Sequence, residues 1–246
     1  MLEVSGLVKR FGGFTAVNKV SFKVDPGEIV GLIGPNGSGK STIFNVTAGN
    51  LAPTSGTIEF LGRHIAGLPV HAIINAGIGR TFQIPRPFKR LSLLENVAVA
   101  GYYGRGQVSR AKAHEAAERA LALVGLPTDE HARVDGLGAA GLKKLELAKA
   151  LATGPRLLLA DECLSGLDES EMGEASELLR KIRRELGITI VWVEHIMGVL
   201  MRVVDRVMVL DHGEKIAEGS PAEVARNRRV VEVYLGSDAT FAPAKP

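Results

Sequence analysis

The stretch EIVGLIGPNGSGKST, residues 28–42, decides the fold class. Its first half is an uninterrupted apolar run that ends in glycine, which is typical of a strand buried on both faces of a sheet. Its second half fits the pattern G-x-x-x-x-G-K-[ST], and the helix-forming residues IFNVTAG follow it. A buried strand, a glycine-rich turn and a helix in this order predict a phosphate-binding loop.

The predicted phosphate loop comprises Gly34, Pro35, Asn36, Gly37, Ser38, Gly39, Lys40, Ser41 and Thr42. Its glycines let backbone N–H groups turn inward, and the N-terminus of the next helix adds the positive end of its dipole. We expect Lys40 to reach the β- and γ-phosphates of a nucleotide and the Ser41 hydroxyl to ligate Mg²⁺. The alternative is a glycine-rich turn that matches by chance, and the strand-turn-helix context argues against it.

Other apolar runs indicate what surrounds this loop. RLLLADE (156–162), ITIVWVEH (188–195) and RVMVLDHG (206–213) also read as buried strands, with helical patterns between them. The sequence therefore predicts an α/β fold with a parallel sheet covered by helices. Near the N-terminus, apolar Val20, Phe22 and Val24 alternate with polar residues, which indicates a half-buried antiparallel strand.

Residues 84–155 look different from the sheet region. Ala113, Ala117, Ala120 and Val124 recur at helical spacing, and residues 142–152 predict a second helix. We expect a single domain over residues 1–236, with a mostly helical lobe inserted at about residues 84–155. Residues 237–246 are expected to form a flexible tail.

Composition narrows the class of protein. A formal net charge of +3 over 246 residues is too small to argue for nucleic acid as a partner. Cys163 is the only cysteine, which excludes an internal disulfide and fits a reducing compartment. The N-terminus lacks a signal-peptide pattern, and no apolar run reaches the roughly 20 residues of a spanning helix. We expect a soluble protein whose membrane role comes through a partner.

Acidic and imidazole side chains stand at the ends of predicted buried strands, the edge where open α/β sheets bind ligands. We expect Asp161 to hold Mg²⁺ through water and Glu162 to polarise an attacking water molecule. His195 ends another strand and is a candidate contact for the γ-phosphate. Without the phosphate loop, surface acids and a structural histidine would be the simpler interpretation.

In order and spacing, these motifs resemble those of the ATP-binding cassette (ABC) ATPases over nearly the whole chain. The resemblance implies a RecA-like parallel core, an antiparallel N-terminal β subdomain, ATP and Mg²⁺. Phe11 resembles the aromatic residue that stacks on adenine, with Val17 beside it; Phe14 is the alternative, and core packing competes for both. Gln83 resembles the Q-loop glutamine, which contacts Mg²⁺ or the lytic water, and His195 the switch histidine. Ser165, Gly166, Leu167 and Asp168 resemble the D-loop that touches the opposite subunit.

Two longer segments narrow the resemblance. Residues 80–100 and 217–236 are similar to ATPase subunits of branched-chain amino-acid importers. The same branch includes importers of urea or short amides and the ATPase of lipopolysaccharide export, so the cargo stays open. The resemblance implies two ATPase subunits closing head to tail around ATP, paired transmembrane permease subunits, and indirectly a solute-binding protein. It also implies a peripheral position on the cytoplasmic face of the plasma membrane.

The family's Leu-Ser-Gly-Gly-Gln signature is altered here to Leu137, Gly138, Ala139, Ala140 and Gly141. A hydrogen bond to a charged group contributes about 1.5–3 kcal/mol, so losing the serine hydroxyl weakens capture of the γ-phosphate. A helix expected to begin near Leu142 keeps its free N–H groups, so the clamp is weakened and not abolished. Because a signature acts on the partner's ATP, we expect a heterodimer with unequal sites.

Other classes of protein share some of these motifs. A soluble ABC protein working on ribosomes or DNA usually carries two cassettes or a long coiled-coil insertion, and this chain has neither. A GTPase needs a guanine-reading Asn-Lys-x-Asp stretch, which is absent, and the segments at Gln83 and His195 argue against a kinase as well. The altered signature keeps open a regulatory subunit that binds ATP and hydrolyses it weakly or not at all.

Overall fold

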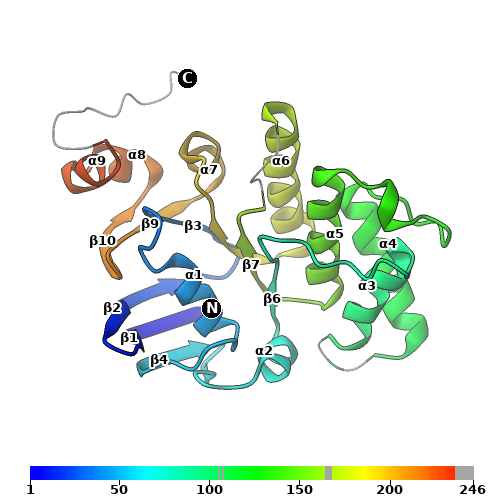
Figure 1. Cartoon of the computed structure of the whole chain (residues 1–246), viewed down its shortest axis with the longest axis horizontal. Helices are drawn as coiled ribbons and strands as arrows, with labels where there is room; N and C mark the ends of the chain where they lie inside the picture. The colour runs from blue at the N-terminus through cyan, green and yellow to red at the C-terminus, as the bar shows by residue number, and fades with distance from the viewer. Residues whose placement is uncertain (105, 107, 164–167, 236–246) are drawn as a thin grey trace. The chain divides into compact units, whose positions relative to one another are not determined.

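The computed structural model describes residues 1–104, 106, 108–163 and 168–235 (Figure 1). The chain forms two compact units. The first unit combines Met1–Pro69 with Ile190–Pro246, and the second is Val70–Thr189. The phosphate loop and His195 therefore belong to the first unit, and Gln83, Asp161 and Glu162 belong to the second.

An antiparallel sheet of the first unit contains β1 (Leu2–Phe11), β2 (Phe14–Val24), β4 (Ser55–Phe60) and β5 (Arg63–His64), in the order β2-β1-β4-β5. The predicted alternation is confirmed, since Val20, Phe22 and Val24 are buried and the polar residues between them are exposed. This sheet is the antiparallel N-terminal β subdomain that the sequence indicated.

The strand that carries the phosphate loop lies inside a second group of strands. Strand β3 (Ile29–Ile33) is buried along its whole length and pairs in parallel with both β8 (Thr189–Val193) and β9 (Arg206–Asp211). Strand β10 (Glu214–Gly219) adds to β9 in antiparallel fashion. Parallel strands buried on both faces need continuous apolar sequences, which is why these runs were recognisable.

Helices α1 (Lys40–Thr47), α7 (Met197–Val203), α8 (Pro221–Arg226) and α9 (Arg228–Leu235) complete the first unit. Gly31 shows how closely α7 packs on the strands, because a Cβ there would lie 2.7 Å from Leu200 Cδ2. Helix α8 begins with a capping box formed by Ser220 and Glu223, and it lies beside β10 with α9 (Figure 1).

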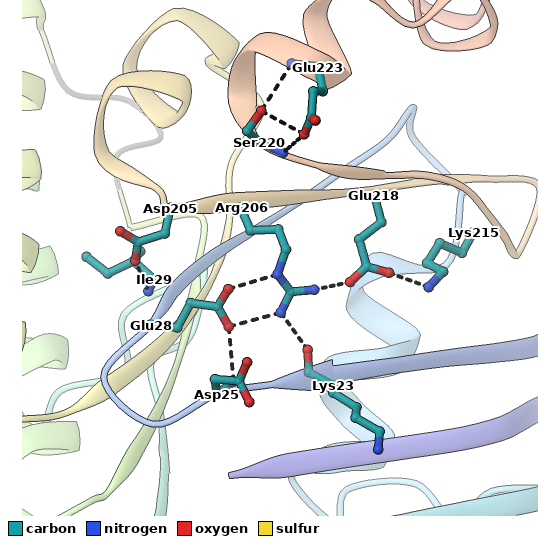
Figure 2. Close-up of polar contacts among 10 residues, drawn as sticks. All are labelled: Lys23, Asp25, Glu28, Ile29, Asp205, Arg206, Lys215, Glu218, Ser220 and Glu223. Atoms are coloured by element: carbon teal, nitrogen blue, oxygen red, sulfur yellow. Dashed lines mark hydrogen bonds and ion pairs between the residues drawn. The ribbon is translucent and has the colours of Figure 1, made fainter.

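A polar network joins the N-terminal ends of β3 and β9 to β10 (Figure 2). The Arg206 guanidinium donates to both carboxylate oxygens of Glu28, at 2.8 and 2.9 Å, and also to Glu218. The Asp205 carboxylate accepts the Ile29 N–H at 2.8 Å. Burial alone would raise the pKa of Glu28, but hydrogen bonds from Arg206 and the Asp25 amide, with the Arg206 charge, hold it below 4.5.

The second unit contains α2 (Val70–Ala76), β6 (Ile78–Arg80), β7 (Leu157–Asp161) and α6 (Glu169–Leu186), with β6 parallel to β7. Along the chain, the segment between β6 and β7 contains α3 (Leu93–Tyr102), α4 (Arg110–Val124), a 3₁₀ turn (Val134–Gly136) and α5 (Ala139–Ala152). Helices α3, α4 and α5 pack on one another, as in the predicted lobe (Figure 1). The predicted apolar face of α4 is buried at Ala113, Ala117, Ala120 and Val124.

The α/β fold class is confirmed, and one predicted boundary is wrong. Helix α5 was expected to begin near Leu142, and it begins at Ala139. Ala139 and Ala140 are strong helix formers, and extended Gly138 serves as the N-cap, so the helix starts three residues earlier. The extent of the single domain and of its lobe stays a prediction. The predicted flexible tail, residues 237–246, lies outside the described residues.

Candidate functional site

The phosphate loop of the first unit depends on glycines at places where no side chain fits. A Cβ at Gly34 would lie 2.2 Å from the Leu210 carbonyl oxygen, and a Cβ at Gly39 would lie 2.7 Å from that of Ala16. Gly39 also has a φ of 105°, which an L side chain rarely adopts. The loop therefore folds tightly between β9 and β2 and delivers the chain to the N-terminus of α1.

Lys40 lies over this loop. Its ammonium donates to the carbonyl oxygens of Gly34 at 2.7 Å and Pro35 at 2.9 Å, and the residue is 5% exposed. Ser41 is exposed and Thr42 half-buried in the first turn of α1, while Asn36 and Gly37 are exposed at the tip. The Ser38 hydroxyl is buried and has no hydrogen-bond partner in the described part of the chain.

The candidate adenine contacts belong to the hairpin of β1 and β2. The Phe11 side chain is 45% exposed, and the Lys9 ammonium lies 5.0 Å from its ring centroid. Phe14 pairs with Phe11 across the hairpin and is 63% exposed. Core packing therefore does not explain either ring. Val17 is fully buried, and its Cγ2 would be 3.5 Å from a Cβ at Gly39, so it lies against the phosphate loop.

The C-terminal helix α9 also reaches the phosphate loop, which sequence reasoning missed. The Gly34 backbone hydrogen-bonds the Tyr234 hydroxyl, and burial raises the pKa of that phenol to about 12. A tyrosine in a short amphipathic helix gives no signal in the sequence for a contact with residues 200 positions earlier.

His195 follows β8 and is exposed. Its backbone N–H donates to the Glu194 carboxylate at 3.0 Å, and Glu194 itself is 2% exposed. A buried acid beside the candidate histidine was not singled out from the sequence, although it stands within the quoted run at 188–195. The pair fixes the backbone where β8 ends.

In the second unit, Asp161 ends the buried strand β7. The Arg80 guanidinium lies 2.8 Å from its carboxylate, and both side chains are nearly buried. The Thr81 hydroxyl accepts the Asp161 N–H at 2.9 Å. These contacts hold the Asp161 carboxylate in one orientation at the end of the strand, beyond what the sequence run indicated.

Glu162 follows in an unusual backbone conformation, with a φ of 45°. This left-handed region is uncommon for residues other than glycine. The Glu162 side chain is 7% exposed, and its carboxylate accepts a hydrogen bond from the Gln83 side-chain amide. The structure thus brings two predicted site residues, separated by 79 positions, into direct contact.

The signature segment forms the N-terminus of α5. Gly138 is the N-cap, with extended backbone and no side-chain cap, and Ala139, Ala140 and Gly141 form the first helical turn. A Cβ at Gly141 would lie 2.9 Å from the Leu137 side chain, so glycine lets Leu137 fold back on the helix. Backbone N–H groups of a first turn have no carbonyl partner within the helix.

Of the predicted D-loop, Ser165, Gly166 and Leu167 lie outside the described residues. Asp168 is described, and it caps α6 by accepting the Glu171 N–H at 2.9 Å. The Glu171 carboxylate accepts the Asp168 N–H in return, at 3.0 Å. These reciprocal bonds form a capping box that fixes where α6 starts.

The glycine-rich loop between a buried parallel strand and a helix defines the class of phosphate-loop nucleoside triphosphatases. Comparison with known proteins identifies the family within that class. A family model described as ABC transporter matches residues 17–165, and a second, described as branched-chain amino acid ATP-binding cassette transporter, matches residues 214–240. The chain belongs to the ABC transporter ATP-binding family, and it is an ATPase.

The relatives agree with this membership. The chain is 38% identical to the high-affinity branched-chain amino acid transport ATP-binding protein LivG of Salmonella typhimurium, over 96% of this chain and 98% of LivG. It is 37% identical to BraF of Pseudomonas aeruginosa, a protein of the same description, over 96% of this chain and 98% of BraF.

Solved structures are similar as well. The ADP conformation of MJ1267, an ATP-binding cassette of an ABC transporter, has a TM-score of 0.87 and 29% identity, over 96% of this chain and 98% of that one. The cassette cbiO1 from Clostridium perfringens has a TM-score of 0.82 and 28% identity, over 95% of each chain.

Proposed function

We propose that this chain binds Mg·ATP and hydrolyses it to energise an importer of branched-chain or related amino acids. The main support for branched-chain amino acids as the cargo is that residues 214–240 match the family model of branched-chain amino acid cassettes. This match is additional to the general ABC transporter match of residues 17–165. LivG and BraF, whose names describe branched-chain amino acid transport, support it over nearly their whole length. The chain then works as a peripheral subunit on the cytoplasmic face of the membrane. No helix among the described residues is long and apolar enough to cross one.

The phosphate loop fits a polyphosphate. Its cradle excludes side chains at Gly34 and Gly39, and a buried Ser38 hydroxyl lacks a partner in the described part of the chain. Lys40 provides positive charge beside the loop carbonyls. Backbone N–H groups of the loop residues other than Pro35 bind the phosphates, and Phe11 stacks on adenine with Val17 beside it.

The donor set also fits Mg²⁺, an ion that proteins bind through one or two carboxylates together with substrate phosphates. Ser41, Gln83 and Asp161 would hold it, and the bound ion neutralises phosphate charge. In the chain as described, no group of three His, Cys, Asp or Glu side chains forms a metal site by itself.

Glu162 takes the role of orienting the attacking water and accepting its proton, with Gln83 hydrogen-bonded to the same carboxylate. His195 contacts the γ-phosphate from the end of β8. The buried hydrogen bonds around Asp161 and Glu162 keep both carboxylates in fixed orientations, which general-base catalysis requires.

The partner is a second ABC ATPase subunit with an ordinary signature, arranged head to tail in a heterodimer. The first-turn amides of α5 at Ala139, Ala140 and Gly141 face the partner's nucleotide, without the hydroxyl that a serine at position 138 would add. That site is weaker than the one built on Lys40 and Glu162.

Transmembrane permease subunits dock on the second unit. Large apolar side chains are exposed there, at Phe82, Ile84, Phe88, Val99, Tyr102 and Tyr103. A cavity of about 480 Å³ between α3 and α4 is lined by Leu91, Val99 and Tyr102, among others. Exposed apolar patches of this kind mark protein interaction sites. A solute-binding protein delivers the amino acid to the permease and does not contact this chain.

The test uses the transporter purified from its native membrane through a tag on this chain. Glu162→Gln should retain Mg·ATP binding, measured by calorimetry, and lower ATP turnover at least about 100-fold, as removal of a general base does. Lys40→Ala should weaken binding itself. The amino acids that stimulate turnover identify the cargo, with urea and lipopolysaccharide as comparison substrates. Unchanged turnover in Glu162→Gln would favour a regulatory subunit instead.

A further inference from the structure

Helix α5 holds the backbone of the Gln83 segment through charged side chains. Lys143, Glu146 and Lys149 recur at helical spacing on α5. The Glu146 carboxylate, 4% exposed, accepts the Arg86 N–H at 3.0 Å. The Lys149 ammonium donates to Glu146 at 2.6 Å and to the Arg86 carbonyl at 3.2 Å. One face of the helix thus holds both polar backbone groups of Arg86.

Lys143 extends this row to the candidate catalytic residues. Its ammonium donates to the Gln83 carbonyl at 3.0 Å and to the Glu162 carbonyl at 2.7 Å. The side chains of these same two residues hydrogen-bond each other. Gln83 and Glu162 are therefore linked twice: their side chains bind each other, and their backbone carbonyl oxygens both bind the Lys143 ammonium.

The backbone of Glu162 gives this contact a specific task. Its φ of 45° is a conformation that persists only when the surrounding structure holds it. An ammonium has three N–H donors and no acceptor, so it can bind two carbonyl oxygens at once. Hydrogen bonds with a charged donor are also stronger than neutral ones.

Lys143 connects this arrangement to the other nucleotide site. It lies four residues after Ala139, about 6 Å along a helix whose first turn is the signature segment. The residues that Lys143 and Lys149 hold, 83 and 86, lie within the exposed apolar stretch that contains Phe82, Ile84 and Phe88. A shift of α5 would change the Glu162 backbone and the permease-facing stretch together.

We propose that Lys143 is a positioning residue of the ATPase reaction, which holds the Gln83 and Glu162 carbonyl oxygens and so orients the Glu162 carboxylate. This inference rests on the proposed function, in which Glu162 activates the water. Lys143 touches neither substrate nor water in this role. Because Lys143 and the signature segment belong to the same helix, α5, the orientation of Glu162 in one active site depends on the position of the signature segment that acts on the partner's ATP.

The test compares Lys143→Met, Lys143→Arg and Lys144→Met in the purified transporter. We expect Lys143→Met to lower kcat about tenfold or more while KM and Kd for Mg·ATP stay within about twofold, since the phosphate loop is untouched. Lys143→Arg keeps several donors and should recover most of the kcat. Lys144 is the matched control, because its one polar contact among the described residues is a 3.4 Å ion pair with exposed Glu174. Lys144→Met should keep the parent kcat.

A structural readout accompanies the kinetics. Amide hydrogen exchange of the full chain should quicken in Lys143→Met at peptides covering residues 83–86 and 162, and should stay unchanged in Lys144→Met. Should Lys143→Met fail to fold, Lys143→Gln keeps a neutral NH₂ group as donor and should give an intermediate kcat. Parent kcat in the folded Lys143 variants, or an equal loss in Lys144→Met, would overturn the inference. If Glu162→Gln also keeps full turnover, the proposed function itself fails; if it abolishes turnover, only the role of Lys143 does.

Discussion

The conformation of the phosphate loop depends on glycines at single backbone positions. Gly34 and Gly37 both have positive φ, at 154° and 79°. Only Gly34 faces a carbonyl oxygen, since nothing lies within 4 Å of a Cβ at Gly37. A side chain at Gly37 would add only backbone strain, whereas a side chain at Gly34 would add both backbone strain and a steric clash.

Gly34→Ala should therefore destabilise the chain by about 2 kcal/mol more than Gly37→Ala, because overpacking adds to backbone strain. The measurement is the free energy of unfolding in urea, followed by the fluorescence of Trp192. That residue is the only tryptophan of the chain and is fully buried in β8. Equal destabilisation by the two substitutions would show that Leu210 moves aside without cost.

At the scale of elements, strands β3, β9 and β10 share one charge network around Arg206 (Figure 2). Glu28 precedes β3, Arg206 begins β9, and Glu218 lies on β10 and also binds Lys215. Burial lowers the pKa of Lys215, and the charge of Arg206 lowers it further. The network ties these strands together at the end of β3 that lies opposite the phosphate loop.

This network predicts a pH dependence of stability. The pKa of Glu28 in the folded chain lies below its usual 4.5, so the ionised carboxylate stabilises the fold above that pH. The contribution is lost as pH falls below 4.5 and through the folded-state pKa. Glu28→Gln should flatten the acid side of the stability profile, measured by Trp192 fluorescence.

The control for that experiment is Glu3→Gln. Glu3 pairs with Lys23 at 3.0 Å, but both side chains are largely exposed, and such pairs contribute little. The acid profile of Glu3→Gln should match the parent. A parent-like profile for Glu28→Gln as well would mean that the network does not contribute to acid stability.

At the scale of the whole molecule, the altered signature and the glycine-rich phosphate loop are the basis of the asymmetric transporter that we propose. Helix α5 begins at Ala139, and its N-cap, Gly138, has no side-chain hydroxyl that could bind the first backbone N–H groups or a phosphate. In the proposed head-to-tail pair, one nucleotide site would contain the phosphate loop of this chain, and the other would contain its signature segment.

Restoring the signature tests this asymmetry. Gly138→Ser with Ala140→Gly should raise turnover at the partner's site about tenfold, as one regained hydrogen bond to a charged group would do. Phosphate release by the assembled complex measures it. Gly136→Ala is the control, because nothing lies within 4 Å of a Cβ there. Unchanged turnover in the restored variant, or brisk turnover by this chain alone, would count against the unequal heterodimer.

The sequence by itself determined the fold class, the phosphate loop, the buried strands and the acidic pair Asp161 and Glu162. These features depend on local order, because a parallel strand needs a continuous apolar run and a phosphate loop needs its glycines in fixed positions. The buried face of α4 was also readable from its spacing. The start of α5 was not, because the family alignment placed a loop where two alanines favour helix.

Only the tertiary structure decided how these residues are held. The contacts of Gln83 with Glu162, Lys143 with both carbonyls, and Tyr234 with Gly34 join positions far apart in the chain. Lysine and tyrosine have no sequence pattern for such contacts, because the partner is a backbone atom that every residue possesses. The positive φ of Glu162 is likewise set by its surroundings and not by its residue type.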